Sequence, residues 1–362
     1  MTTTVDSSPS TARQRWSIGP TELVYIALLA IVLIGGALAA SQGQNLFSTA
    51  NLVDMFTRSS LLGFIAIGQT FAILCRSLDL SVGYVVALTS LVAATTMAGD
   101  PNRIALGIGA VLLISALIGL ANGLIIVYLR VNPFITTLGM GLIIKGYLDT
   151  QYQGPAGDVP SEFQQFGYTR IGFLPLSTAV MLVVAVIGML YLRKTRTGYH
   201  MFAVGGNAEV ARMSGIRTGR VMVTAHVLCS VCAGLAGLLI AARFGTGSSL
   251  VYNNLYELDS IAAVVLGGTL LLGGRGGIAG TLGGVLILAV LDTVFNIMRV
   301  DPFFKDVLRG VIIIAAVAIY ARRQIDRKAR RIRFDDGSGG APRSGEPAPD
   351  APVPAQQGGG GR

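Results

Sequence analysis

The stretch RKTRTGYHMFAVGGNAEVARMSGIRTGR, residues 193–220, is a long polar and strongly basic interruption between two apolar runs. Within it, Asn207 can cap a short helix from Ala208 to Ser214, and Gly215 can end that helix in the left-handed conformation that glycine adopts cheaply. A capped helix held between two membrane-crossing runs predicts a docking surface for another protein. The alternative is an ordinary basic loop whose arginines only fix the topology of the chain.

The composition around this stretch is that of a membrane protein. Of the 362 residues, 52% are hydrophobic and 13% are charged, whereas a soluble domain is about one quarter charged. The net charge of +9 would suggest a nucleic-acid partner in a soluble protein. Here the basic residues gather at the ends of apolar runs and in the tails. We therefore predict an integral membrane protein surrounded by lipid, with no nucleic-acid partner.

The sequence carries no sign of its own catalytic chemistry. Cys75, Cys229 and Cys232 all fall within apolar runs, where a low dielectric disfavours the thiolate, so neither a redox nor a metal role is expected. No G-x-x-x-x-G-K-[ST] motif is present, so any ATP must be hydrolysed by a different chain. The glycine-rich segment 273–280 resembles a dinucleotide loop only loosely, because no strand precedes it. The chain is predicted to be no enzyme and to bind no cofactor.

Ten apolar runs approach the ~20 residues that a bilayer requires. The first is either an uncleaved span or a signal peptide, and its length of ~27 Å as a helix favours a span. The run that starts at residue 134 is short and contains Lys145. The runs are 23–40, 59–75, 81–98, 104–128, 134–149, 176–192, 221–242, 257–273, 278–298 and 304–320. They define a transmembrane domain over residues 22–320, after an N-terminal tail of residues 1–21 and before a basic and then disordered tail of residues 321–362.

The basic residues also predict the orientation. The central loop 193–220 and the tail that begins ARRQIDRKARRIR at Ala321 carry most of the arginine and lysine, which places both on the cytoplasmic side. The chain is thus expected to cross the cytoplasmic membrane many times, with both termini inside. Segment 151–175 then lies outside, where it either meets an extracytoplasmic partner or simply connects two helices.

Two short motifs recur at matching places. Arg130-Val-Asn-Pro-Phe resembles Arg299-Val-Asp-Pro-Phe, and Leu78-Asp79 has a counterpart in Leu258-Asp259. Each pair occupies the same place in a five-span unit, and an odd number of spans inserts the second unit upside down. We therefore predict an all-α fold of two inverted five-helix repeats, about residues 22–150 and 176–320, with a substrate path between them.

Polar and small residues within the spans provide further candidates. Asp79 and Asp259 either cap helices or line a path, because charge in hydrocarbon is costly and such groups usually face an interior route. His226 is expected to be a satisfied interior group. Glycines four residues apart, such as Gly119 and Gly123, predict close helix packing. The substrate-path candidates are Asp79, Ser81, Asn132, Asp259 and Asn296.

Several segments together resemble one family, the membrane-spanning permeases of sugar-importing ATP-binding cassette transporters of the ribose, xylose, galactose and autoinducer-2 type. The likeness covers about residues 45 to 320. The segments are SLDLSVG (77–83), NPFITTLG (132–139), AVGGNAEVARMSGI (203–216), YELDSIAAVVLGGT (256–269), GGRG (273–276) and GTLG (280–283). The family commonly has Gly-Ile-Asp where this chain has Ser77-Leu78-Asp79, and lysine in place of Arg275.

This resemblance implies the type II importer permease fold and a set of partners. These are a second permease copy, identical or different, two cytoplasmic ATPase subunits that hold the ATP and Mg, and an extracytoplasmic binding protein that delivers a monosaccharide or polyol. It also implies that the helix in the central loop couples to the ATPase. The implied coupling residues are Gly205, Gly206, Asn207, Glu209, Ala211, Arg212, Met213 and Gly215.

Two other classes of membrane protein compete with this interpretation. An ion-coupled secondary transporter also uses inverted repeats but needs no partner. A structural or receptor-type membrane protein would transport nothing. The capped helix in the central loop and the shortage of acids in mid-span favour the ATPase-coupled class.

Overall fold

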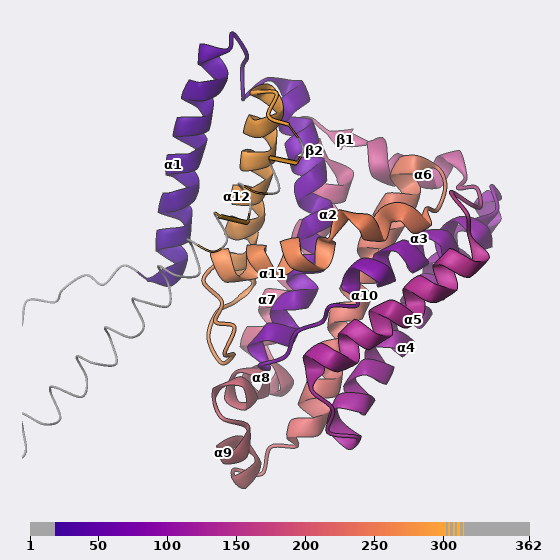
Figure 1. Cartoon of the computed structure of the whole chain (residues 1–362), viewed down its shortest axis with the longest axis vertical. Coiled ribbons are helices and arrows are strands. Elements are labelled where there is room, and N and C mark those ends of the chain that lie inside the picture. The colour runs from indigo at the N-terminus through magenta and orange to yellow at the C-terminus, as the bar shows by residue number, and fades with distance from the viewer. Residues whose placement is uncertain (1–18, 302, 305–306, 308–309, 312–313, 315–362) are drawn as a thin grey trace, which may run out of the picture. The chain divides into compact units, whose positions relative to one another are not determined.

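The computed structural model describes residues 19–301, 303–304, 307, 310–311 and 314. This part of the chain is helical apart from one short hairpin (Figure 1). The first half contains α1 (Pro20–Ser41), α2 (Thr49–Leu74), α3 (Val82–Met97), η1 (Pro101–Arg103), α4 (Ile104–Tyr128), α5 (Pro133–Gln151), α6 (Ser161–Tyr168), β1 (Arg170–Ile171) and β2 (Leu174–Pro175). The second contains α7 (Leu176–Lys194), α8 (Arg196–Gly206), α9 (Ala208–Met213), α10 (Thr218–Phe244), η2 (Ser249–Asn254), α11 (Tyr256–Leu266) and α12 (Ile278–Ile297).

Within the described residues, six helices are long and apolar enough to cross a membrane. They are α1, α2, α4 together with η1, α7, α10 and α12. Large apolar side chains such as Leu33, Leu113 and Ile187 are more than half exposed on the outer faces of α1, α4 and α7. Leucine and isoleucine tolerate this exposure when the surrounding medium is lipid. The prediction of a multi-pass membrane protein is confirmed.

The core forms around α2 and α10. Helix α10 packs against α2, α3 and α4, while α2 packs against α10, α11 and α12. The side chains between them, such as Phe64 and Leu239, are fully buried. A Cβ at Gly119 or Gly123 would press within 2.7 Å of the α10 backbone, so the glycine pair expected to allow close packing sets the α4–α10 crossing.

The helical boundaries differ from expectation in two places. The run 257–273 is not one span: α11 ends at Leu266 after 11 residues, about 16 Å of helix at 1.5 Å per residue. Gly268 then adopts a positive φ of 85° and begins the glycine-rich loop that leads to α12. The helix α2 begins at Thr49, ten residues before its apolar run, because Ser48 accepts a hydrogen bond from the Asn51 amide and caps it.

The remaining predicted runs either form helices or lie mostly outside the described residues. The run 134–149 forms the helix α5, but α5 is not among the six candidate spans. Most of the run 304–320, and both tails, lie outside the described residues. The count of ten spans therefore stays a prediction.

The segment 151–175 folds over one end of the bundle. Strands β1 and β2 pair antiparallel, and Ala156 forms an isolated bridge with Gly247, just after α10 ends. The Tyr168 hydroxyl donates to the Arg243 carbonyl in the last turn of α10. This end of α10 is opposite the end that joins α9.

Candidate functional site

The helix α9 forms at the place that the central loop predicts. The Asn207 side chain accepts hydrogen bonds from the amides of Glu209 (3.0 Å) and Val210 (3.1 Å), which satisfies two of the donors that a helix leaves open at its start. Gly215 has a φ of +82° and ends the segment. In Figure 1, α8 and α9 lie below the lower end of α7. The residue pattern therefore determined this element locally.

Most of the candidate coupling residues of α9 face outward. Met213 is 81% exposed and Val210 is 56% exposed, although both side chains are apolar. Gly206, Asn207, Glu209, Arg212 and Gly215 are exposed as well. Ala211 is the exception on α9, since it is buried in the main core cluster. The helix thus presents a mixed apolar and charged face while one small residue fixes it to the bundle.

Gly205 has a packing role that the sequence did not reveal. It is buried at the end of α8, where a Cβ would overlap the Leu74 carbonyl at the end of α2. The same carbonyl accepts a 3.0 Å hydrogen bond from the Gly274 amide. Gly273 and Gly274, both at positive φ, belong to the glycine-rich loop between α11 and α12. This loop packs against the ends of α8 and α2, and it follows the helix α11 rather than a strand.

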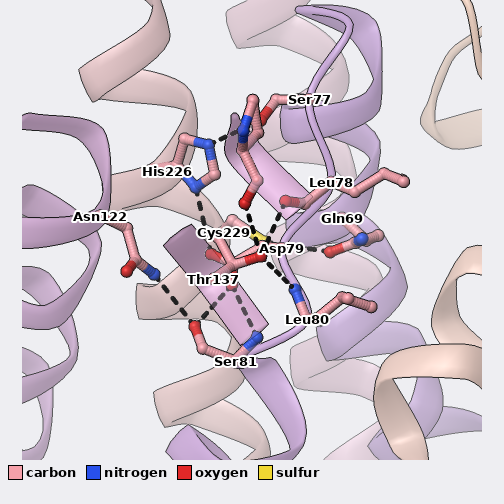
Figure 2. A network of polar contacts seen from close by, with 11 residues as sticks. Gln69, Ser77, Leu78, Asp79, Leu80, Ser81, Asn122, Thr137, His226 and Cys229 are labelled. Atoms are coloured by element: carbon pink, nitrogen blue, oxygen red, sulfur yellow. Dashed lines mark hydrogen bonds and ion pairs between the residues drawn. The ribbon is translucent and has the colours of Figure 1, made fainter. Parts of the chain in front are cut away.

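A buried polar network occupies the break between α2 and α3 (Figure 2). One Asp79 carboxylate oxygen lies 3.2 Å from His226 Nδ1, and His226 Nε2 lies 2.8 Å from the Ser77 hydroxyl. The other carboxylate oxygen accepts from the Ser81 amide (3.0 Å) and the Ser81 hydroxyl. All four residues are buried. His226 is therefore a satisfied interior group, as expected.

Neighbouring helices hold the same break from the other side. The side-chain amide Nδ2 of Asn122 on α4 donates to the Ser81 hydroxyl at 3.0 Å. The Thr137 hydroxyl on α5 accepts from the Leu80 amide at 3.1 Å and lies within hydrogen-bond distance of the Leu78 carbonyl. Polar side chains from α4, α5 and α10 thus satisfy a non-helical segment at membrane depth, which is tolerated where protein surrounds it.

The structure does not gather the five substrate-path candidates. Asp79 and Ser81 lie together and are fully buried, and their place on a substrate path stays a prediction. Ser81 occupies the N-cap position of α3, and Asp79 accepts a hydrogen bond from its amide, as a capping side chain does from the amide two residues later. Asn132 caps α5 by accepting from the Phe134 amide, Asp259 is half-buried in α11, and Asn296 is exposed near the end of α12.

Another set of polar side chains does come together and was missed as a site. Tyr84 on α3 stacks on Tyr252 of η2, and Tyr252 contacts the ion pair between Lys145 and Asp149 on α5. The buried carboxylate of Glu257 lies against the first turn of α3. The i,i+4 spacing of Lys145 and Asp149 was the only local signal, because the other members come from three separate elements.

Comparison with known proteins identifies the family. Residues 51–317 match the model described as the permease component of branched-chain amino acid transport systems. The chain belongs to this family of transport permeases. Among curated relatives, the ribose import permease protein RbsC of Escherichia coli K12 is 35% identical over 304 residues, which cover 83% of this chain and 93% of the relative.

Two more relatives match this permease over a similar length. The galactose/methyl galactoside import permease protein MglC of E. coli K12 is 37% identical over 83% of this permease and 95% of its own length. The RbsC protein of Bacillus subtilis 168 is 36% identical over 82% of this permease and 91% of its own length. No solved structure matches.

Proposed function

We propose that this permease is the membrane-spanning subunit of an ATP-binding cassette importer for a monosaccharide or related polyol. The observation that carries the proposal is the identity of 35–37% with ribose and galactose import permeases over 83% of the chain. The matched region includes the capped helix α9 with its exposed Val210, Glu209 and Met213. An ion-coupled transporter would have no use for such a helix.

The proposed assembly contains a second permease copy, cytoplasmic ATPase subunits and an extracytoplasmic binding protein. The ATPase subunits hold the ATP and Mg, and the permease itself binds no cofactor. Helix α9 docks on the ATPase through its exposed face, while Gly205 and Ala211 transmit its movement into the bundle. A ligand or partner can shift a conformational equilibrium only through different affinities for the two states. Closure of the ATPase subunits around ATP therefore drives transport by favouring one position of α9.

The proposed topology places α9 and both termini in the cytoplasm and the segment 151–175 outside. The permease domain spans residues 22–320, with repeats at about 22–150 and 176–320, and the coupling loop at 193–220 lies within the second. The folded segment with α6, β1 and β2 is then the surface nearest to the binding protein.

Two observations support the inverted-repeat arrangement. Arg130 and Arg299 both have positive φ values, of 56° and 53°, and Asn132 and Asp301 each accept a 2.9 Å hydrogen bond from the amide two residues later. The recurring motif thus has the same local conformation twice. In addition, α2 packs against α11 and α12, whereas α10 packs against α3 and α4. In the proposed repeats α2 corresponds to α10, α3 to α11 and α4 to α12, so each helix contacts the counterparts of the helices that the other one contacts.

Reconstitution tests the proposed function. The permease, its ATPase and its binding protein are placed in vesicles with radiolabelled ribose, xylose, galactose, arabinose or inositol. We expect ATP-dependent uptake of at least one of these solutes. Uptake by the permease without partners, driven by an ion gradient, would favour the secondary transporter. Uptake of leucine or isoleucine in place of sugars would favour the activity that the family description names.

A further inference from the structure

Five side chains, from α3, α5, η2 and α11, make up what we call the Tyr84 cluster: Tyr84, Lys145, Asp149, Tyr252 and Glu257. The first four are linked by a ring stack, a hydrogen bond and an ion pair, and Glu257 lies against Gly83, the residue before Tyr84. The Tyr84 and Tyr252 rings stack with their centroids 5.7 Å apart and their planes at 27°. The Tyr252 hydroxyl donates to Asp149 at 2.6 Å, and Lys145 Nζ lies 5.2 Å from the centre of the Tyr252 ring. Two aromatic faces and an ion pair are therefore adjacent.

In the proposed topology α5 crosses the bilayer, and the Tyr84 cluster then does not face lipid. Lys145 is twelve residues beyond Pro133 along α5, about 18 Å at 1.5 Å per residue, and the apolar core of a bilayer is ~30 Å thick. The side chains of Lys145 and Asp149 are 40% and 43% exposed. Charged groups exposed to hydrocarbon are costly, so such residues face a hydrated path or a partner.

Glu257 gives the cluster a buried hydrogen-bond acceptor that no donor of the described residues reaches. Its residue is only 6% exposed, and within the described residues its Oε2 atom has no hydrogen-bond partner. The carboxylate lies so close to Gly83 that any Cβ there would overlap Oε2. A buried carboxylate oxygen without a donor is strongly unfavourable. The site is therefore suited to a ligand that brings a hydroxyl or amine hydrogen to this oxygen.

We propose that the Tyr84 cluster is a binding site for a polyhydroxylated solute within the translocation path. Glu257 and Asp149 accept hydrogen bonds from solute hydroxyls, Lys145 donates one, and the tyrosine rings cover the apolar face of the sugar ring. Small-molecule sites commonly combine aromatic walls with a few placed polar groups. The inference rests on the proposed function and adds the residues that contact the cargo.

The Asp79 network is a poorer site for the cargo. It is fully buried, and each oxygen of the Asp79 carboxylate already has a partner in Ser81 or His226. The Tyr84 cluster differs because the side chains of Lys145 and Asp149 are partly exposed, and because the buried Glu257 has an acceptor oxygen with no partner among the described residues. The two clusters are therefore assigned different roles, one structural and one in solute contact.

A transport assay tests the proposal in the complete reconstituted complex. Glu257→Gln keeps the size of the side chain but replaces one acceptor with a donor. We expect uptake to fall at least tenfold, while the ATPase activity stimulated by the loaded binding protein stays within twofold of the wild type. Asp54→Asn is the matched control, because Asp54 is an exposed carboxylate paired with Arg58 on the surface of α2, and it should leave uptake unchanged.

The outcomes separate the two proposals. Normal uptake by Glu257→Gln with an active wild-type complex would overturn the solute site and leave the proposed function intact. A wild-type complex that transports none of the sugars or polyols would overturn the proposed function itself. If Glu257→Gln lowered the melting temperature together with uptake, Glu257 would stabilise the fold rather than contact the solute, which would also contradict the solute site.

A labelling experiment gives a second, independent measurement. The native cysteines at positions 75, 229 and 232 are buried, so one introduced cysteine can be labelled selectively with a charged thiosulfonate reagent. We expect the transported sugar to slow the labelling of Asp149→Cys at least threefold. Thr150→Cys, exposed one residue further along α5, should be unaffected. Equal labelling of Asp149→Cys with and without sugar would contradict direct contact.

Discussion

Gly205 lies where three segments distant in sequence meet. Only the hydrogen side chain of glycine fits there, so a larger residue would push these segments apart. Its neighbours are the Leu74 carbonyl at the end of α2 and the Gly274 amide in the loop before α12. Gly206, the next residue, has open space on its side-chain face. Two adjacent glycines that look equivalent in the sequence therefore have different reasons to be there.

This difference yields a prediction for a matched pair of variants. Gly205→Ala should destabilise the permease by about 1–3 kcal/mol, because overpacking displaces either Leu74 or the Gly274 loop. Gly206→Ala should leave stability unchanged. Thermal unfolding of the detergent-purified permease, followed by fluorescence size-exclusion chromatography, measures both. Equal melting temperatures for the two variants would contradict the close packing of Gly205 against Leu74 and Gly274.

The pair of Asp79 and His226 gives a second prediction at this scale. Breaking a buried, hydrogen-bonded pair leaves one partner uncompensated and costs about 3–5 kcal/mol. We expect Asp79→Ala and His226→Ala each to lower the melting temperature, and the double variant to be less destabilised than the sum. Non-additivity of 0.5–3 kcal/mol is typical of residues in contact.

Ser230→Ala is the control for this double-mutant cycle. Ser230 is buried one turn further along α10, and within the described residues its hydroxyl has no hydrogen-bond partner. It should combine additively with Asp79→Ala. A fully additive Asp79–His226 pair would instead show that the two side chains stabilise the bundle separately.

At the level of elements, α9 is short enough to depend on its cap. A helix of six residues gains little from its own hydrogen bonds, since nucleation fixes several residues before the first bond forms. The two bonds accepted by Asn207 and the burial of Ala211 therefore determine whether α9 is formed. Its outer face, with Val210 and Met213, is free to bind another protein.

The cap leads to a prediction about coupling. Asn207→Ala should remove about 1 kcal/mol of helix stability and reduce the ATPase stimulation by the loaded binding protein, because the docking face is less often formed. Asn207→Ser, which can also cap, should restore most of the stimulation. Stimulation and uptake are measured in the reconstituted complex. An unchanged Asn207→Ala variant would argue against α9 as the coupling element.

The short helices α3 and α11 show a related point about elements. Each follows a gap between two predicted apolar runs, and each begins near the acidic residue of the recurring Leu-Asp motif. In the first break, the Thr137 hydroxyl of α5 bonds the Leu80 amide and the Leu78 carbonyl, while the Asn122 side chain of α4 bonds the Ser81 hydroxyl. Hydropathy did not locate the end of α11 at Leu266, because the loop residues 267–273 continue the apolar run.

At the level of the whole molecule, the proposed inversion predicts opposite accessibility for two matched sites. Asn132 and Asp301 are both exposed and occupy equivalent positions in the repeated motif. We expect Asn132→Cys to react with a membrane-impermeant maleimide only from the cytoplasmic side and Asp301→Cys only from outside. The buried native cysteines give a low background. Labelling of both from one side would refute the inverted repeat.

The sequence predicted those features that depend on local pattern. Asn207, Glu209 and Gly215 specify α9 within nine residues, and the glycine spacing at 119 and 123 predicts the close approach of α4. By contrast, the Tyr84 cluster draws on four elements between residues 84 and 257, and no local pattern links them. The role of Glu257 depends on Gly83, which is 174 residues earlier in the chain.

The resemblance to sugar-importing permeases implied a transport role. By itself, the sequence pattern determined that the chain crosses a membrane and that a capped helix interrupts its apolar runs. These follow from composition and short-range spacing, which act on the chain wherever it folds. Only the tertiary structure decided that Asp79 is buried, that α11 ends after 11 residues, and that among the described residues no donor reaches Glu257 Oε2. Burial and hydrogen-bond satisfaction are properties of contacts between distant segments, so they arise only when the helices pack.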